Sequence, residues 1–379
     1  MNSDFSRKPT ITWVTPHYFV DCDFNPEILE RILEQFEIRW IILLPHRNAR
    51  FKVQDFDELR SLKGLTIEFM QAKYRQRDPR GLNYYFQLYK RIRHLNSDVN
   101  YLNCVPDPYL MPFYWLLNKE KTIFCAHDGD VSHVFEFRWI RSIVFNLAYR
   151  YIKYCCMFSP SQAGLFKKKF PKVKIFVISL ALKSFGKGTS TRADNQVNFL
   201  SFGVLNYSKN VDLLIEAACN LYEKGHRNFK VSINGNCANW EFYRSLIRYP
   251  EIFDCSIRMI DNSEIPDMFS SAHYFVQPYR YVSQSGALKV AFNYNVPVIA
   301  TNYPGFADEI RVGVNGYLFN PGDVKDLEKI MLDALASHQS GYKLLSEKMA
   351  RYTSEHYSAN TLGGKYLQMF NEVIERARD

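Results

Sequence analysis

Short apolar stretches alternate along the chain with stretches in which apolar residues recur every three or four positions. The first kind is typical of buried strands, and the second of amphipathic helices. In the first half, the pattern predicts strands at 10–14, 38–44, 65–69, 99–102, 121–126, 155–158 and 175–179. It predicts helices between them at 25–36, 81–95, 108–117, 135–154 and 161–170. Strands and helices that alternate in this way indicate an α/β fold with a parallel, doubly wound sheet.

The same rhythm begins again after a polar, glycine-bearing stretch, 183–196, that has no periodicity. Strands are predicted at 199–202, 229–233, 257–260, 274–276, 296–300 and 316–319, and helices at 211–224, 239–248, 265–271, 287–294 and 324–336. Because 379 residues exceed what one core usually holds, we expect two domains. We place the first domain at 1–187, a linker at 188–196, the second domain at 197–357 and a last amphipathic helix at 358–379.

One stretch of the second half, 276–301, combines a strand, a tight polar turn, a helix and a second strand. Its turn, Ser283 to Gly286, leads directly into the predicted helix. The first turn of a helix presents unpaired N–H groups and the positive end of the helix dipole. The sequence therefore predicts an anion site at this turn, and phosphate is the usual anion at such a site.

The amino-acid composition limits the class of protein and the cellular compartment that we expect. The chain is 47% hydrophobic and 23% charged, as in an ordinary globular protein, and has no apolar run of 18 residues, so we expect no membrane-spanning helix. The first residues lack the apolar core of a signal peptide, which favours the cytoplasm. The eight cysteines show no zinc-ligand spacing, so we expect reduced and mostly buried thiols.

The formal net charge of +9 lies in the first half. Residues 1–190 contain 29 of the 48 Lys and Arg residues but 18 of the 39 Asp and Glu residues, which leaves 19 basic and 21 acidic residues in the remainder. No nucleic-acid-binding motif accompanies this excess, so nucleic acid is not expected as a partner. An anionic membrane surface or an anionic, lipid-linked substrate explains the asymmetry instead.

Ligands of open parallel sheets bind beyond the carboxyl ends of the strands. The loops that the pattern places there contain His127 and Asp128 in the first half. In the second half they contain Gly203 to Lys209, Gly235, Asp261 to Ser263, and Ser283 to Gly286.

Motifs occur in a fixed order at 202–217, 265–272, Pro278-Tyr279, Gln284-Ser285-Gly286, 297–301, Pro304-Gly305, Glu309 and 315–318. Through these motifs, residues 198–336 resemble the donor domain of the family-4 glycosyltransferases. The Gln-Ser-Gly turn is similar to that of a branch that assembles capsular and other surface polysaccharides. In the first half, Ala126-His127-Asp128 with His133 downstream is similar to the His-Asp turn of related polysaccharide-assembly transferases.

The resemblance implies the GT-B fold, in which two Rossmann-like domains face each other across a cleft and the C-terminal helix returns to the N-terminal domain. It implies a retaining hexosyltransferase that moves a sugar from a nucleotide-sugar donor to a glycan acceptor, which we expect to be lipid-linked, in cell-surface polysaccharide assembly. Such an enzyme is expected in the cytoplasm, with peripheral contact to the inner face of an anionic membrane. The nucleotide sugar is a co-substrate, and no cofactor or metal is implied.

The resemblance also assigns roles to residues. His127, Asp128 and Lys209 become the catalytic candidates, with Lys209 as the cation on the donor diphosphate and the Ser285 and Gly286 N–H groups beside it. The donor-binding candidates are Gly203, Asn206, Gly235, Asp261, Tyr279, Gln284, Ser285, Gly286 and Glu309. His17 and His133 are candidates for the acceptor side.

This sequence departs from the family pattern at three places. Val204 and Asn206 occupy the loop where many members carry an Arg for the diphosphate, so one cation is missing. The Glu-x7-Glu pair of many members is absent, since its positions fall near Val282 and Val290. In the first domain, Pro16-His17-Tyr18 replaces the usual Gly-Gly loop. The ribose contact of the second glutamate is therefore unassigned.

Each candidate also has a structural interpretation. Lys209 is compatible with an exposed lysine at a helix start, Gln284 to Gly286 with a simple cap, and His127 with Asp128 with a hydrogen-bonded core pair. Glu309 is compatible with a cap, and the basic segment 167–174 with a solvated face rather than a membrane contact. Asp21-Cys22-Asp23 resembles a metal motif in the wrong context. Two other functions stay open: a sugar-nucleotide epimerase on the same fold, and a degenerate glycan-binding or scaffold protein.

Overall fold

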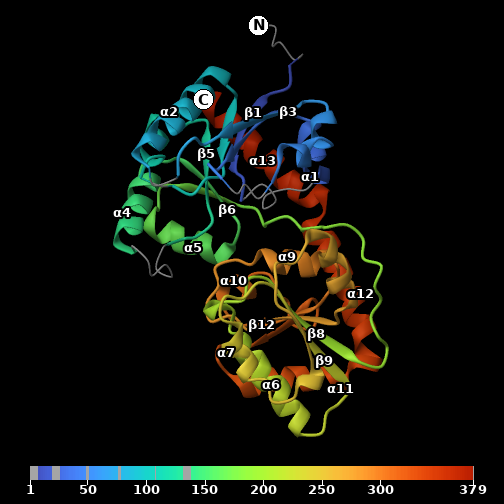
Figure 1. Ribbon diagram of the computed structural model, residues 1–379. Helices are drawn as coiled ribbons and strands as arrows, with labels where there is room; N and C mark the ends of the chain where they lie inside the picture. The colour runs from blue at the N-terminus through green and yellow to red at the C-terminus, as the bar shows by residue number, and fades with distance from the viewer. Residues whose placement is uncertain are drawn as a thin grey trace. The chain divides into compact units, whose positions relative to one another are not determined.

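Two parallel β-sheets, each with its own helices, organise the chain (Figure 1). The computed structural model describes residues 7–18, 26–47, 51–75, 78–106, 108–130 and 138–378. Unit 1 comprises Met1–Ala181 and Tyr357–Asp379, and unit 2 comprises Leu182–His356. The predicted α/β class with two parallel, Rossmann-like sheets is confirmed.

The described residues of unit 1 form a seven-stranded sheet in the order β3-β2-β1-β4-β5-β6-β7. Its strands are β1 (Thr10–Pro16), β2 (Glu37–Leu44), β3 (Leu65–Gln71), β4 (Val99–Leu102), β5 (Thr122–Ala126), β6 (Tyr154–Met157) and β7 (Lys174–Val177). Its helices are α1 (Pro26–Leu33), α2 (Leu82–Leu95), α3 (Met111–Leu116), α4 (Arg138–Tyr149), α5 (Pro160–Lys169) and α13 (Ala359–Arg378), with short 3-10 turns η1 (Val53–Phe56), η2 (Leu59–Ser61) and η3 (Pro79–Gly81). The strand order reverses between β1 and β4, as in a doubly wound fold.

Side chains that alternate along the strands bury both faces of this sheet. Val14 of β1 faces a core that also includes Phe145 of α4 and Phe166 of α5. Its neighbour Trp13 points to the opposite face, where its ring lies 5.4 Å from Tyr366 and 5.9 Å from Phe370 of α13. The last helix of the chain is therefore part of the core of unit 1, beside α1 (Figure 1).

The described residues of unit 2 form a six-stranded sheet in the order β10-β9-β8-β11-β12-β13. Its strands are β8 (Val197–Phe202), β9 (Phe229–Asn234), β10 (Phe253–Ser256), β11 (Tyr274–Gln277), β12 (Val298–Thr301) and β13 (Gly316–Phe319). Its helices are α6 (Val211–Glu223), α7 (Trp240–Ser245), α8 (Ile265–Ser271), α9 (Gly286–Asn293), α10 (Pro304–Ala307), α11 (Val324–Ala336) and α12 (His338–Tyr357), with η4 (Tyr207–Lys209), η5 (Pro250–Ile252) and η6 (Asn262–Glu264). The order reverses between β8 and β11.

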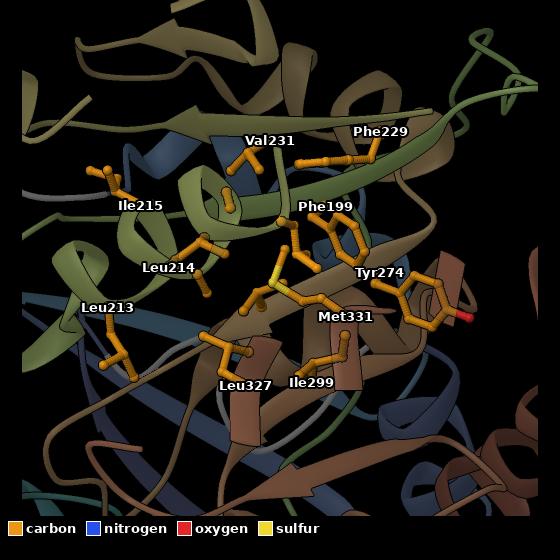
Figure 2. Packing of buried hydrophobic residues seen from close by; sticks show 14 of the residues in the cluster. Phe199, Leu213, Leu214, Ile215, Phe229, Val231, Tyr274, Ile299, Leu327 and Met331 are labelled. Carbon is orange, nitrogen blue, oxygen red and sulfur yellow. The ribbon is translucent and has the colours of Figure 1, made fainter. Parts of the chain in front are cut away.

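The same alternation builds the core of unit 2. Phe199 of β8 and Tyr274 of β11 stack at 5.7 Å and pack with Leu214 of α6 and Met331 of α11 (Figure 2). On the other face of the sheet, Phe269 of α8 contacts Phe202 and Phe275, at 5.5 and 5.2 Å between ring centroids. Each strand therefore gives one set of side chains to α6 and α11 and the other to the helices opposite.

One predicted strand and the end of one predicted helix are wrong by four residues or more. The strand predicted at 257–260 lies earlier, because β10 pairs with β9 from Phe253 to Ser256. As an edge strand with partly exposed side chains, β10 needs no continuous apolar run. The helix predicted at 135–154 continues too far, because α4 ends at Tyr149 and Tyr154 is a fully buried residue of β6. The part of that prediction at 135–137 lies outside the described residues.

Helix α12 was not predicted, although it is 20 residues long. Its buried residues form a narrow stripe at a spacing of four: Leu345, Met349, Thr353 and Tyr357. A stripe this narrow, with one polar member and little else that is apolar, gives a weak periodic signal.

No helix among the described residues is both long enough and apolar enough to cross a membrane.

The packing of α13 on the sheet of unit 1 predicts the effect of shortening the Phe370 side chain. Phe370 is fully buried, and its ring lies 5.7 Å from Phe36 and 5.8 Å from Tyr101. We expect Phe370→Ala to lower the local stability of unit 1 by about 3–5 kcal/mol, through lost contacts and a cavity. Hydrogen exchange of the β1 and β4 amides in the full chain measures this loss. Glu375→Ala, an exposed change on the same helix, should leave that exchange unaltered; faster exchange in α13 alone would contradict the account.

Candidate functional site

The loops that follow β8 and β11 meet at the point where the strand order of unit 2 reverses. Lys209 ends the first loop at η4, and Tyr279 lies in the second loop, two residues after β11. This is the position at which open parallel sheets bind ligands.

A chain of side-chain hydrogen bonds joins these two loops. Lys209 Nζ donates to Tyr279 Oη at 2.5 Å and lies 3.8 Å from the centroid of the same ring. Gln277 Nε2 donates to Tyr279 Oη and to Ser285 Oγ, at 2.9 Å in each case. Tyr279 is 6% exposed, Gln277 0% and Ser285 7%. The ammonium group of Lys209 is thus linked through buried side chains to the start of α9.

Ser285 is the N-cap of α9, and its Oγ accepts the Leu288 N–H at 3.4 Å. The first turn of α9 contains no acidic residue, so no carboxylate of the helix competes for its N–H groups. The preceding loop packs closely on α10, since a Cβ on Gly305 would lie 2.5 Å from Ser283 O. The sequence predicts an anion site at Ser285, Gly286 and the partly buried Gln284. The loop that carries these residues packs against α10.

Arg280 fixes the loop that carries Lys209. Its Nη2 donates to Asp212 Oδ2 at 2.6 Å, its Nη1 donates to Asn210 Oδ1, and its guanidinium lies 4.2 Å from the Tyr207 ring centroid. Its backbone N–H also donates to Ser208 O, at 2.9 Å. Sequence reasoning missed this residue, because its partners lie about 70 residues away along the chain.

Lys183 is a second cation beside α9 that sequence reasoning missed. A Cβ on Gly286 would lie 3.4 Å from Lys183 Nζ, and the Lys183 N–H donates to Lys289 O at 3.4 Å. The sequence pattern placed Lys183 in an aperiodic polar stretch, where nothing marks one lysine as different from another. In the structure that stretch begins unit 2, and Thr189 and Ser190 donate their N–H groups to Asp267 of α8.

The other donor-side candidates from the glycine loops lie at the same edge of the sheet. Gly203, with φ +126°, and Gly235, with φ +142°, pass so close that a Cβ on Gly235 would lie 1.8 Å from Gly203 O. Only glycine fits both the positive φ and this approach. Asn206 caps η4, since its Oδ1 accepts the Ser208 N–H at 3.1 Å. Asp261 is exposed and begins η6, where its N–H donates to Glu264 Oε1 at 3.1 Å.

Glu309 lies in a buried ion pair with Lys289 of α9. Lys289 is 0% exposed and Glu309 6%, and Asn315 Nδ2 donates to Glu309 O at 3.0 Å. Burial lowers the pKa of Lys289, and the adjacent carboxylate opposes that shift. The pair fastens α9 to the segment after α10, so the observed contacts of Glu309 are structural ones.

In unit 1, His127 follows β5, and its Nε2 lies 2.8 Å from Oδ1 of Asn103, which follows β4. Its ring packs on Phe158, with centroids 4.6 Å apart. Burial lowers the pKa of His127 to about 3, so the imidazole is neutral at pH 7. With the amide oxygen as acceptor, Nε2 carries the proton.

The remaining candidates of the first half are Asp128, His17 and His133. Asp128 is partly buried, next to Gly129, whose N–H donates to Gln162 Oε1 at 2.8 Å. His17 follows β1, where its N–H donates to Leu43 O at 2.9 Å, and it lines a pocket of about 510 Å³ in unit 1. His133 and the Asp21-Cys22-Asp23 motif lie outside the described residues.

Each unit has a group of residues with its own chemistry. In unit 2, Lys209, Lys183 and the start of α9 form a positive seat suited to a phosphate group. In unit 1, a neutral imidazole lies at the carboxyl edge of the sheet and is suited to hydrogen bonding rather than to charge. Among the described residues, no group of three or more His, Cys, Asp or Glu side chains is arranged to hold a metal ion. The expected independence from metal stays a prediction.

Comparisons with known proteins agree with this geometry. Residues 187–356 match a family model described as "Glycosyl transferases group 1". No curated protein sequence matches the chain. Three similar solved structures are a glycosyltransferase from Rickettsia africae (16% identity, 97% of this chain and 99% of that chain, TM-score 0.73), sucrose-phosphate synthase from Thermosynechococcus elongatus (13%, 97% and 100%, 0.74) and Anabaena HepE in complex with UDP and glucose (14%, 96% and 100%, 0.66).

At these identities the structural likeness establishes the fold, which is the GT-B fold of glycosyltransferases with two Rossmann-like domains. The family match covers most of unit 2, including Lys209 and the turn from Gln284 to Gly286. The family match shows that residues 187–356 are similar to group 1 glycosyltransferases. The assignment to family 4 and to its capsular branch stays a prediction.

The lowered pKa of His127 predicts a pH dependence. Between pH 6.5, near the ordinary value for histidine, and about 3, the unfolded chain binds a proton at this position that the folded chain does not bind. Folding therefore loses stability as the pH falls through this window, by at most about 1.4 kcal/mol per pH unit, and the loss is absent above it. Urea unfolding at pH 7 and pH 5 should show a smaller loss for His127→Gln than for the wild type.

Gln339→Asn, an exposed change between two groups that do not titrate, provides the control and should lose as much stability between pH 7 and pH 5 as the wild type. An unchanged pH dependence in His127→Gln would mean that the imidazole takes up its proton in the folded chain. The neutral state assigned above would then be wrong.

Proposed function

We propose that this chain is a retaining, nucleotide-sugar-dependent hexosyltransferase that extends a lipid-linked glycan in surface polysaccharide assembly. The observation that carries the proposal is the hydrogen-bonded chain from Lys209 through Tyr279 and Gln277 to Ser285. It lies at the switch point of unit 2, within the segment that matches the group 1 family model. The presence of UDP and glucose in the HepE complex supports a nucleotide-sugar donor.

On the donor side, the reaction breaks the bond between the sugar C1 and the phosphate oxygen of the donor. Negative charge then develops on the departing nucleoside diphosphate, and groups that stabilise this charge lower the barrier. Lys209 and the N–H groups at the start of α9 perform this role. The Lys183 ammonium group lies beside Gly286, the first residue of the same helix. It supplies the cation that the sequence lacks at Val204 and Asn206.

On the acceptor side, a bond forms between the same C1 and an acceptor hydroxyl oxygen. The hydroxyl proton passes to the donor phosphate oxygen as that oxygen leaves, so the protein need not supply a base. A neutral His127, oriented by Asn103, hydrogen-bonds a sugar hydroxyl, and Asp128 holds a further hydroxyl. The product nucleoside diphosphate leaves from unit 2.

Lys209 and Lys183 are the two cations of the proposed diphosphate-binding site, which we call the donor seat. Their removal should affect the kinetics of sugar transfer. We expect Lys209→Ala to lower the kcat of sugar transfer by at least about 100-fold, as loss of one preorganised charge contact does. Lys183→Ala should lower kcat as well, by about tenfold, because its ammonium group lies at the end of the seat. Product analysis with a panel of nucleotide sugars and glycan acceptors measures both. Lys230→Ala, an exposed lysine of β9 in the same unit, is the charge-matched control and should be unaffected.

Full activity of Lys209→Ala, with folding intact, would remove Lys209 from the mechanism. The same assay decides between the proposed function and its competitors. Conversion of a nucleotide sugar to its epimer without transfer would favour an epimerase. Nucleotide-sugar binding without turnover of any donor would favour a glycan-binding or scaffold protein.

We also propose that unit 1 contacts an anionic membrane through α3 and α4. On α4, Trp139 is 68% exposed and Ile143 51%, and a spacing of four places them on one face. Trp115 of α3 joins this surface, since its Nε1 donates to Leu147 O at 2.9 Å. Exposed aromatic and aliphatic side chains among basic residues are typical of interfacial membrane contacts.

The segment 167–174, which the sequence suggested for this role, is less suited to it. Lys167 Nζ donates to Val173 O at 2.8 Å, and Lys174 Nζ pairs with Glu372 Oε1 of α13 at 2.7 Å. These lysines therefore already take part in the packing of unit 1.

Vesicle sedimentation tests the membrane contact. We expect binding to vesicles that contain phosphatidylglycerol and little binding to pure phosphatidylcholine. Trp139→Ser with Ile143→Ser should weaken binding at least tenfold, or about 1.4 kcal/mol, because two apolar side chains no longer enter the interface. Met259→Ser, which changes a side chain of unit 2 that is 78% exposed, should have no effect. Equal binding of the double variant would exclude this face.

A further inference from the structure

The pocket that His17 lines is formed by unit 1 alone and is not part of the donor seat. It has a volume of about 510 Å³ and lies beyond the carboxyl ends of β1, β2 and β3, with the start of α2 as its other wall. This size is in the range of sites that hold small ligands. The strands bring to it loops that are far apart in the sequence, at 16–18, 43–46 and 70–75.

The charged side chains that the described residues bring to the wall of the pocket are all basic. The described residues that line it include His17, His46, Lys73, Arg75 and Arg80, and none of the described lining residues is Asp or Glu. Arg80 is partly neutralised, since its Nη2 donates to Asp78 Oδ2 at 2.6 Å just outside the wall. Lys73 and Arg75 extend from the segment after β3, opposite the start of α2. A concave surface with one sign of charge concentrates the field toward an anion.

The start of α2 adds to this positive field. The helix has 14 residues and no acidic side chain in its first turn, and Gly81 and Asn83 at its start line the pocket. Its dipole presents its positive end to the same space, and the Asp78 carboxylate, which caps the turn η3 that leads into the helix, offsets part of this field.

Aromatic and amide side chains provide a second kind of contact. Tyr84 and Tyr85 line the pocket with their rings edge to face, 5.4 Å apart, and Tyr84 Oη donates to Met70 O at 2.9 Å. Tyr74 lies under the Arg80 guanidinium, 4.1 Å from its ring centroid. The amides of Asn83 and Gln87 complete the polar contacts. Aromatic faces beside amides suit a sugar ring, which has apolar C–H groups and a rim of hydroxyls.

We infer that this pocket binds a phosphate-bearing sugar, and that the sugar belongs to the acceptor. The phosphate contacts Lys73 and Arg75 and faces the start of α2, while the sugar ring lies against the tyrosines. That the ligand is the acceptor rests on the proposed function; that it is a phosphorylated sugar rests on the wall of the pocket alone. The phosphate has two possible sources, a free sugar phosphate or the diphosphate of a lipid-linked glycan.

Calorimetric titration of the full-length chain tests the inference. Glucose 1-phosphate and inorganic pyrophosphate are the probes, with glucose as the neutral comparison. The Lys209→Ala with Lys183→Ala background is used throughout, so that the donor seat loses both of its cations and binds the probes as little as possible. We expect both phosphate probes to bind and glucose not to bind. Lys73→Ala with Arg75→Ala should weaken phosphate binding at least tenfold, and added salt should weaken it further.

A charge-matched variant, Lys168→Ala with Lys172→Ala, removes two exposed lysines elsewhere in unit 1 and should bind as before. An equal loss in both double variants would mean a general charge effect and would overturn the inference. Unchanged binding in Lys73→Ala with Arg75→Ala would also overturn it.

A further titration identifies the source of the phosphate. A water-soluble prenyl diphosphate glucose should bind at least tenfold more tightly than glucose 1-phosphate if the lipid-linked diphosphate is recognised. Equal affinities would indicate that a single phosphate group is sufficient. Either ratio is compatible with the inference, provided that binding requires Lys73 and Arg75.

The failure of this inference can be told apart from the failure of the proposed function. Donor turnover and sugar transfer are measured with a double variant, Lys73→Ala with Arg75→Ala, in which the donor seat is unchanged. Transfer to neutral glycans, with no phosphate binding in the pocket, would overturn the inference and leave the transferase intact. Phosphate binding in the pocket of a chain that transfers no sugar would support the inference and reject the proposed function.

Discussion

A buried amide connects the two loops on which the donor seat depends. Gln277 ends β11, is 0% exposed, and donates both to Tyr279 Oη and to Ser285 Oγ. Lys209 and the start of α9, which come from separate loops, are thereby held in one arrangement. Both bonds use the Gln277 amide N–H groups, while its Oε1 has no hydrogen-bond partner among the described residues, and a shift of either loop would leave a buried donor unpaired. A charge held in place before the reaction stabilises the leaving group without reorganisation.

The two sheets use the same topology for different chemistry. In unit 2, Lys209 and the start of α9 lie at the switch point and Lys183 lies beside that helix, and we propose that a diphosphate binds there. In unit 1, the corresponding edge carries a neutral His127 and, beyond β1 to β3, a basic pocket. Part of the positive charge excess of residues 1–190 therefore lies on the wall of that pocket. We propose that one unit takes the donor and the other the acceptor.

Most of the fold follows from the sequence, because buried parallel strands such as β2 have nearly continuous apolar sequences. The exceptions, β10 and α12, bury little apolar surface and leave a weak pattern. Lys209 and Ser285 were found because a local motif surrounds them, although their roles stay predictions. Lys183, Arg280 and the Lys289–Glu309 pair were not found, since each acquires its meaning from a contact that only the folded chain creates.

The central claim is that Lys209 and the start of α9 bind the diphosphate of a nucleotide. The most direct measurement is the calorimetric affinity of nucleoside diphosphates against the matching monophosphates, for UDP, GDP, ADP and CDP. For the preferred base, the account predicts that the diphosphate binds at least tenfold more tightly than the monophosphate, and that Lys209→Ala abolishes most of this difference. Equal affinities for the two nucleotides, or a difference that survives Lys209→Ala, would contradict it.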